Sequence, residues 1–202
     1  MPIRVSREGL EITFSTFMIY LGLKKQYDYA HHQVLFSGDY RKNMDQLFRE
    51  YRLPEDPSVY LQNPWKTDAS LAPPGKSTLY ILVPVPNNRS AISWDRVKEG
   101  FREQILDLVE KRGGYKNLRK AIEVERIFTP WDWEEEMDLY NGAAFSLSHN
   151  MSQMLYYRPH NRNQDVKNLY LVGGSTHPGS GLPTILLSAV ITADLVGLIP
   201  ND

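Results

Sequence analysis

A glycine-rich turn near the end of the chain constrains its fold more than any other feature. Residues 168–189 have the sequence NLYLVGGSTHPGSGLPTILLSA, in which the turn separates a short apolar run from a longer one. The turn holds four glycines: Gly173, Gly174, Gly179 and Gly181. A short apolar run bounded by glycine is typical of a buried strand, and a longer one is typical of a helix. The sequence therefore predicts a buried strand over residues 168–172 and a helix over residues 183–198 that packs on it.

Such a turn can hold a ligand at the start of the following helix. Glycines let the backbone turn tightly and let a ligand approach with no Cβ in the way. The first N–H groups of a helix have no partner within it and carry a partial positive charge, which suits a phosphate or an electron-rich carbonyl of a cofactor ring. Packing alone also explains many glycine-rich turns. The spacing here is not GxGxxG, so the turn is no standard dinucleotide fingerprint.

The rest of the chain mixes strand-like and helix-like segments without a strict βαβ order. Strands are predicted where β-branched and aromatic residues gather, over residues 15–23, 31–36, 59–62, 78–83 and 121–128. Helices are predicted where apolar residues recur at helical spacing, over residues 40–51, 94–112 and 130–140. Ser93 and Thr129 are suitable N-caps, and Pro84 is predicted to end the strand before it. This order predicts an α/β chain of α+β character with a mixed sheet.

The composition is that of an ordinary globular protein, and it excludes several functions. The formal net charge of -1 gives no basic face for nucleic acid. The chain has no cysteine, which excludes disulfides, thiolate metal sites and cysteine nucleophiles, and its five histidines lack metal-binding spacing, so no metal site is predicted. Residues 1–9 show no secretory signal, and residues 182–199 are too short and too polar to cross a membrane. These observations predict a cytoplasmic protein.

Several stretches of the chain resemble one enzyme family. The glycine turn is similar to the C-terminal flavin motif of bacterial and fungal phytoene desaturases, whose pattern runs GxxTHPGxGxP. The segments TDASLAPPGKSTLYILVPVPN from Thr67, FTP from Phe128, YNG from Tyr140 and YRPHN from Tyr157 agree with the same family. Their order and spacing match throughout, so the resemblance covers nearly the whole chain. THPGxGxP is specific within amine-oxidase-like flavoproteins, whereas each of the other segments is a weak indication by itself.

The resemblance implies a two-domain, amine-oxidase-like flavoprotein that desaturates a carotenoid precursor of the phytoene type. Residues 1–140 would form a substrate-binding domain around a tunnel for a long polyene, and residues 141–202 would form the C-terminal segment of an FAD-binding domain. The residues that would bind FAD are Gly173, Gly174, Gly181, Leu182 and Pro183. In this family a hydride equivalent passes to the flavin and a proton leaves the neighbouring carbon. Because the substrates dissolve in bilayers, the resemblance also implies contact with a membrane surface.

The chain departs from the family pattern near its N-terminus. Residues 1–37 contain no glycine-rich nucleotide turn, so the βαβ unit expected to bind the ADP half of FAD is absent. Three explanations remain open: a C-terminal fragment, a subunit whose partner chain supplies the FAD-binding half, or a decayed, non-catalytic protein that binds lipid or a partner. A related enzyme that oxidises a carotenoid end group would share the motif and also remains open.

Three side chains near the turn are candidates for a role in the reaction. His177 is the candidate catalytic residue, because a histidine facing the flavin could hydrogen-bond the cofactor or shuttle a proton. The alternative, that His177 braces the turn through a backbone carbonyl, is favoured because a loop histidine beside Pro178 has local partners. Arg158 and Arg162 could reach a flavin phosphate, although a surface salt bridge is the more common fate of an arginine.

Overall fold

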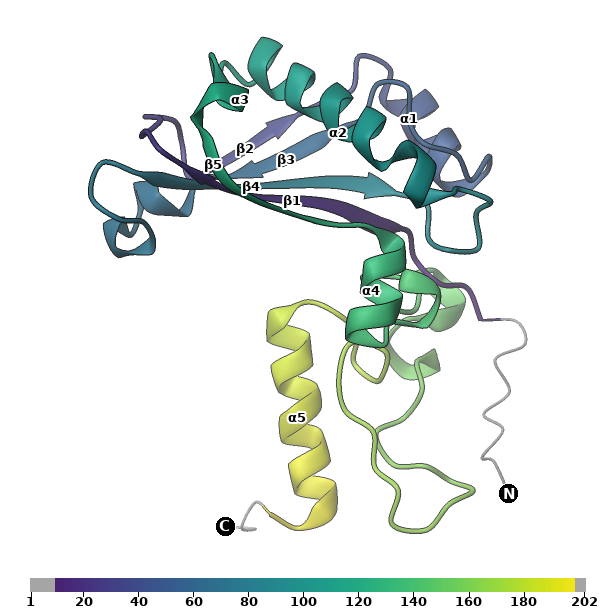
Figure 1. Cartoon of the computed structure of the whole chain (residues 1–202). Coiled ribbons are helices and arrows are strands. Elements are labelled where there is room, and N and C mark those ends of the chain that lie inside the picture. The colour runs from purple at the N-terminus through teal and green to yellow at the C-terminus, as the bar shows by residue number, and fades with distance from the viewer. Residues whose placement is uncertain (1–9, 199–202) are drawn as a thin grey trace. The chain divides into compact units, whose positions relative to one another are not determined.

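The computed structural model describes residues 10–198, which form two compact units. The first, here called the sheet unit, is Phe14–Ala144. The second, here called the C-terminal unit, combines Met1–Thr13 with Phe145–Asp202, of which residues 10–13 and 145–198 are described. Figure 1 shows the elements of both. The assignment of residues 1–140 to a polyene substrate and of residues 141–202 to FAD stays a prediction.

The sheet unit is built on a five-stranded sheet in the order β2-β3-β4-β1-β5. Its strands are β1 (Ser15–Leu23), β2 (His32–Leu35), β3 (Val59–Gln62), β4 (Ser77–Val85) and β5 (Ile122–Phe128). The α+β class is confirmed, but all four strand pairs are antiparallel, so the prediction of a mixed sheet is wrong. The reason is physical: alternation along a strand indicates which face is buried and not the direction of the neighbouring strand.

One face of this sheet is buried beneath helices. In Figure 1, α1 (Tyr40–Phe48), α2 (Trp94–Lys111) and α3 (Leu118–Ala121) lie on the same side of the strands. Strand β4 alternates strictly between buried and half-buried residues, and its buried set joins the apolar stripe of α2 in one core. Phe17 of β1 stacks on Trp94 and meets Phe101 edge-on, with ring centroids 5.5 and 5.1 Å apart. Full burial of one large apolar side chain contributes about 1.5–3 kcal/mol, so this core dominates the stability of the unit.

Most predicted elements of the sheet unit are confirmed, with small shifts at their ends. Helix α2 begins after Ser93 as predicted, although the Ser93 side chain makes no capping hydrogen bond. Helix α4 (Pro130–Met137) begins after Thr129, which forms a capping box with Asp132. Pro84 does not end its strand, because it lies within β4 opposite Thr16. The pairing of β4 with β3 stops at Leu82, so Pro84 lies where β3 needs no N–H donor from β4.

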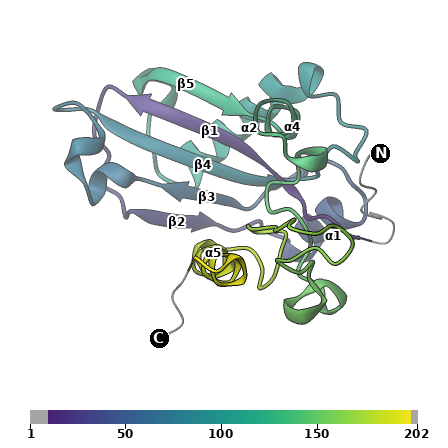
Figure 2. The ribbon, with the colours of Figure 1, turned by 90° about the horizontal axis from the view of Figure 1, so that it is seen from below.

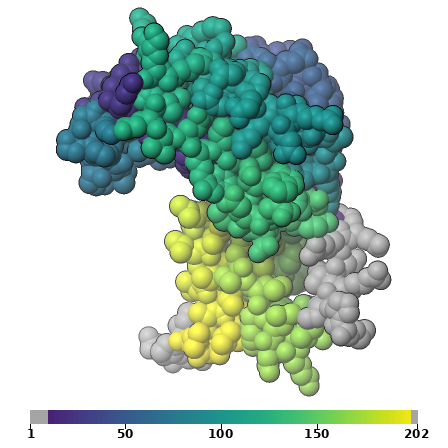
Figure 3. Space-filling model, in the orientation of Figure 1, coloured from purple at the N-terminus to yellow at the C-terminus, as the bar shows by residue number. Residues whose placement is uncertain are grey.

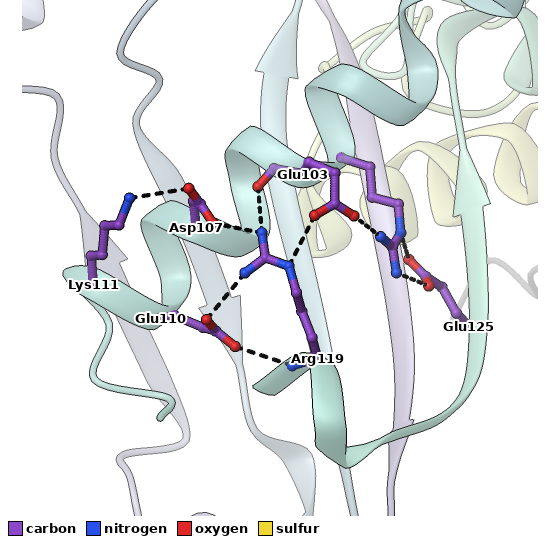
Figure 4. Close-up of polar contacts among 7 residues, drawn as sticks. Glu103, Asp107, Glu110, Lys111, Arg119 and Glu125 are labelled. Atoms are coloured by element: carbon purple, nitrogen blue, oxygen red, sulfur yellow. Dashed lines mark hydrogen bonds and ion pairs between the residues drawn. The ribbon is translucent and has the colours of Figure 1, made fainter. Parts of the chain in front are cut away.

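Ionic contacts join α2 to the two elements that follow it, as Figure 4 shows. Arg119 of α3 contacts three carboxylates of α2, at 2.9, 2.6 and 3.1 Å: those of Glu103, Asp107 and Glu110. Arg102 of α2 contacts Glu125 of β5 at 2.6 Å. Pairs that keep contact with solvent stabilise a fold by only about 0–1 kcal/mol each, so the cluster orients α3 more than it holds the unit together.

The C-terminal unit has little regular structure apart from α5 (Leu182–Val196). The predicted strand over residues 168–172 is wrong, because its only ladder contact with the described residues is an isolated bridge between Arg162 and Tyr170. Leu171 N–H also donates to the carbonyl of Asn161 at 2.7 Å. A strand needs a neighbouring strand to pair its N–H and C=O groups in a continuous ladder, and residues 10–198 provide this segment with no such ladder.

Helix α5 has one polar stripe, formed by Thr184, Ser188 and Thr192, and most of its other side chains are apolar. Much of the helix lies at the surface (Figure 3, yellow). The side chains of Leu182, Leu186 and Val190 are 78%, 66% and 53% exposed. Leu169 and Leu171 are half-buried, so a helix packed on a buried strand is not found among the described residues. None of the helices in the described part of the chain has the length and apolar character needed to span a bilayer.

Candidate functional site

The glycine turn leads directly into the N-terminus of α5. Gly173, Gly179 and Gly181 have φ angles of 121°, 146° and 104°, a region that favours glycine. A Cβ placed on Gly173 would meet no atom within 4 Å, so the backbone faces open space there. A Cβ on Gly174 would lie 3.2 Å from the Cβ of Ser180, so the two ends of the turn are close together. The turn is thus closed behind Gly174 and open in front of Gly173.

The first turn of α5 has no side-chain cap. Its N-cap residue is Gly181, and no capping hydrogen bond forms there. The Thr184 hydroxyl donates backward, to the carbonyls of Ser180 and Gly181 at 2.6 and 2.8 Å. Pro183 has no N–H, which leaves the N–H groups of Leu182 and Thr184 for a ligand. Leu182 and Pro183 are exposed, and the positive end of the helix dipole favours an electron-rich group at this point.

A buried polar network ties the turn to the middle of α5. The hydroxyl of Ser188, which is 0% exposed, accepts hydrogen bonds from Asn161 Nδ2 at 2.8 Å and from Gly173 N–H at 3.3 Å. It also lies 3.0 Å from the Thr176 hydroxyl, which donates to the Gly173 carbonyl at 2.8 Å. Asn161 reaches the Leu171 carbonyl at 3.2 Å as well. Because polar groups in a low-dielectric interior are costly to leave unpaired, this network fixes one geometry of the turn.

Arg158 lies behind the turn and is 1% exposed. Its guanidinium makes five hydrogen bonds to four backbone carbonyls: those of Leu147, Ser148, Gln153 and Gly174. The two bonds to Gly174 are 3.1 Å from Nε and 2.7 Å from Nη2. Neither predicted role of this arginine, a flavin-phosphate contact or a surface salt bridge, fits a side chain that is buried and whose donors are all used. Burial lowers its pKa.

Two histidines connect the turn to the segment before it: His149 contacts the turn, and His177, which belongs to the turn, contacts residues outside it. His149 Nε2 lies 2.8 Å from the Ser180 hydroxyl, and burial, with the charge of Arg158 as a second cause, lowers the pKa of His149. His177 Nδ1 lies 2.9 Å from the Leu155 carbonyl oxygen, and His177 N–H donates to the Pro159 carbonyl at 2.9 Å. The contacts of His177 have the geometry of a brace, while its catalytic role stays a prediction.

A pocket of about 630 Å³ opens beside His177 within the C-terminal unit. It is lined by Tyr156, His160, Asn161, Arg162, Asn163, Gln164, Lys167, His177, Ile191 and Leu195. Arg162 and Lys167 are both cationic, and the two α5 residues supply an apolar wall. Of the two arginines considered from the sequence, Arg162 is therefore the one that lines a cavity.

The face of the sheet opposite α2 is a second candidate surface, and Figure 2 shows the strands from this side. Three half-buried tyrosines and the buried Phe128 form a row of rings across neighbouring strands. The centroids of Tyr20–Tyr80, Tyr60–Tyr80 and Tyr20–Phe128 are 5.3, 6.2 and 6.0 Å apart. Burial raises the pKa of Tyr20 and Tyr80, so their hydroxyls stay neutral at ordinary pH. The alternation of β1, β3 and β4 places these tyrosines on the face opposite the core.

The sequence of the chain is similar to one family model and to several known proteins. Residues 36–197 match the family model described as flavin containing amine oxidoreductase. The chain is 53% identical over 186 residues to a 4,4'-diapophytoene desaturase (4,4'-diapolycopene-forming) of Methylomonas sp, covering 92% of the chain. It is 44% identical over 93% of its length to a zeta-carotene-forming phytoene desaturase of Myxococcus xanthus, and 41% identical over 94% to a lycopene-forming phytoene desaturase of Pseudescherichia vulneris. The chain spans only 36%, 36% and 39% of the lengths of these relatives.

Proposed function

Because the chain belongs to the flavin containing amine oxidoreductase family, we propose that it takes part in the FAD-dependent desaturation of a carotenoid precursor. The observation that carries the proposal is the agreement among the relatives, which are carotenoid desaturases 53%, 44% and 41% identical to this chain over at least 92% of its length. The family description names a flavin, and FAD is the form that we propose.

The glycine turn fits a flavin. The proposed contacts are Gly173, Gly174, Gly181, Leu182 and Pro183. The open space in front of Gly173 is what a flat ring would need, and a Cβ there would project into it. The uncapped N–H groups at the start of α5 suit an electron-rich carbonyl of the ring. Preorganised donors of this kind stabilise negative charge that develops during a reaction.

The chemistry divides between the cofactor and the chain. A bound flavin supplies the two-electron oxidation of the substrate carbons. The chain orients the ring through the turn, which the network of Thr176, Ser188 and Asn161 holds in one shape. His177 either braces the turn or moves the proton, and its bond to the Leu155 carbonyl supports the brace.

The aromatic face of the sheet is the proposed wall for the polyene. A carotenoid precursor offers no hydrogen-bonding group, so its recognition depends on shape and on apolar area, at about 25 cal/mol per Å² buried. Tyr20, Tyr60, Tyr80 and Phe128 present a continuous aromatic row with neighbouring ring centroids 5.3 to 6.2 Å apart. Because such substrates dissolve in bilayers, we also propose that the protein works at the cytoplasmic surface of a membrane.

The exposed apolar surface of α5 supports the proposal that the chain binds a protein partner. The apolar face of a helix is normally buried, yet Leu182 and Leu186 of α5 are 78% and 66% exposed. Leu169, Leu171 and Val172 are apolar, but their segment forms no more than an isolated bridge with the described residues. We propose that a dinucleotide-binding half, on the same or another polypeptide, pairs with this segment and covers α5.

The test of this function supplies that half in trans. The chain would be co-expressed with the part of the Methylomonas relative that it does not match, then incubated with FAD and with liposomes that contain 4,4'-diapophytoene or phytoene. We expect a product with a longer conjugated system, detected by its absorption after chromatography, only when FAD and both polypeptides are present. Polyene binding without turnover would instead indicate a non-catalytic binding protein, and a product oxidised at its end group would indicate an end-group oxidase.

A further inference from the structure

We propose that Arg158 is the positioning residue of the glycine turn, which it fixes from behind while placing there a positive charge that no carboxylate offsets. The inference rests on the proposed function insofar as the turn is a flavin site. Its two parts, the geometry of the hydrogen bonds and the unbalanced charge, are separate observations and can be tested separately.

The geometry depends on the shape of a guanidinium. Nη1 donates to the carbonyls of Ser148 and Gln153 at 3.2 and 3.1 Å, and Nη2 to that of Leu147 at 3.0 Å. Nε and Nη2 both donate to the Gly174 carbonyl. Three segments that are separate in the sequence are thereby joined through one planar group. A lysine has three donors on a single nitrogen and cannot reproduce this fork, so arginine and lysine are not equivalent here.

The charge of Arg158 has no ionic partner in the described part of the chain. All five hydrogen bonds go to neutral carbonyls. The nearby acid Glu11 is exposed, and its carboxylate accepts a hydrogen bond from Asn150 instead. A buried cation without a counter-ion is costly to maintain. The pKa of the neighbouring His149 is lowered first by burial and second by the charge of Arg158.

This charge lies on the closed side of a turn whose other side is open. Arg158 contacts Gly174, and the adjacent Gly173 faces open space. A fixed positive charge in a place with little water attracts an electron-rich group strongly, because the local dielectric constant is low. The charge is already in position, so the protein does not have to rearrange when the bound group gains negative charge. A flavin gains negative charge on reduction. Arg158 therefore favours the reduced form of a flavin bound at the turn, in addition to giving the turn its shape.

The experiment compares Arg158→Lys, which keeps the charge, with Arg158→Gln, which removes it. Arg96→Gln is the matched control, because Arg96 is an exposed arginine of α2 in the sheet unit and has no part in the glycine turn. Two quantities would be measured on the full chain without ligand: amide hydrogen exchange at Thr176 and His177, and the pKa of His149 by NMR titration. The affinity and reduction potential of FAD would be measured on the chain reconstituted with the dinucleotide-binding half.

In both Arg158 variants we expect exchange at Thr176 and His177 to accelerate by about tenfold or more, as for the loss of one or two hydrogen bonds. The His149 pKa should rise in Arg158→Gln and remain low in Arg158→Lys. The potential of bound FAD should become more negative in Arg158→Gln alone, and the control should match the parent. If Arg158→Gln does not fold, Arg158→Lys tests both parts of the proposal. Its amide exchange tests the role of the guanidinium hydrogen bonds, and its FAD reduction potential tests the role of the positive charge.

Parent-like exchange at the turn in Arg158→Lys would overturn the proposal, and so would acceleration spread evenly over the whole unit, since that marks a merely structural role. A flavin potential that falls as far in Arg158→Lys as in Arg158→Gln would overturn the role of the charge. A different result, in which the reconstituted parent binds no FAD while exchange and the His149 pKa change as expected, contradicts the proposed flavin site and leaves the positioning of the turn by Arg158 supported.

Discussion

The sheet unit and the C-terminal unit are stabilised in opposite ways. In the sheet unit, apolar side chains such as Ile81 and Leu106 are 0% exposed inside a continuous core, and the charges lie outside. In the C-terminal unit, Arg158, Asn161 and Ser188 are buried, while the leucines of α5 face outward. The first unit has the organisation of a domain that folds by burying its own apolar surface. The second has a polar interior and an apolar exterior, which is the organisation of a part that docks against something else.

The largest test of this comparison uses the same substitution in a helix of each unit. Leu106 of α2 is 0% exposed and Leu186 of α5 is 66% exposed. Leu106→Ala should lower the free energy of unfolding by about 2–5 kcal/mol, because it leaves a cavity in a packed core. Leu186→Ala should change it by about 0.5 kcal/mol or less. Urea denaturation followed by circular dichroism measures both.

A large loss for Leu186→Ala would show that α5 is already covered in the isolated chain. If Leu186→Ala weakened association with the dinucleotide-binding half while the isolated chain kept its stability, α5 would serve association and not the folding of this chain. Leu106→Ala is the reverse control, since it should destabilise the chain and leave the α5 surface unchanged.

The second test concerns ligand binding by the glycine turn. Gly181 has a φ of 104°, which a β-branched residue adopts only with strain, and it precedes the uncapped end of α5. Gly181→Val should abolish FAD binding in the reconstituted protein, since strain and the loss of close backbone approach act together. Gly100→Val is the control, because Gly100 is exposed on α2 and a Cβ there meets nothing within 4 Å. FAD titration of both variants measures the effect. An affinity for FAD in Gly181→Val equal to that of the parent would show that the flavin does not bind at this turn.

A smaller effect is expected at His177. If the ring braces the turn through the Leu155 carbonyl, His177→Ala removes one hydrogen bond and should weaken FAD binding by about 0.5–1.5 kcal/mol. The rate of desaturation at saturating FAD should then change little. A loss of about a hundredfold or more in that rate, with FAD still bound, is the scale of a missing general acid or base and would make His177 catalytic.

The two units also differ in how well the sequence predicts them. Local signals worked: Thr129 followed by Pro130 predicted the start of α4, and the capping box is formed. The strand over residues 168–172 was wrong, because an apolar run shows that a segment could pair but not whether a partner strand is present. Arg158 was named from the sequence, but the roles predicted for it were wrong for a similar reason. Its burial depends on four carbonyls brought together by the folded backbone, and no spacing in the sequence reports them.

The smallest predicted effect tests whether the charged exterior of the sheet unit matters to its stability. Arg119→Ala removes the contacts of α3 to Glu103, Asp107 and Glu110. We expect a loss of about 1 kcal/mol or less in the free energy of unfolding, because solvent screens these pairs. High salt should reduce the difference between the variant and the parent. Lys76→Ala, which removes one pair with Glu123 elsewhere on the surface, is the control for a single exposed contact.

The pH dependence of the Arg119 variant gives the sign of the effect. Lys111, and next Arg119, hold the pKa of Asp107 below its ordinary value of 3.8. A carboxylate whose pKa is lowered by folding stabilises the folded state above that value, and this contribution is lost as the pH falls through the lowered pKa. The difference in stability between the parent and Arg119→Ala should therefore be constant near neutral pH and shrink below about pH 4. Thermal unfolding from pH 7 to pH 3 measures it. A difference that grows on acidification would mean that Arg119 acts through packing on α2 and not through its charge.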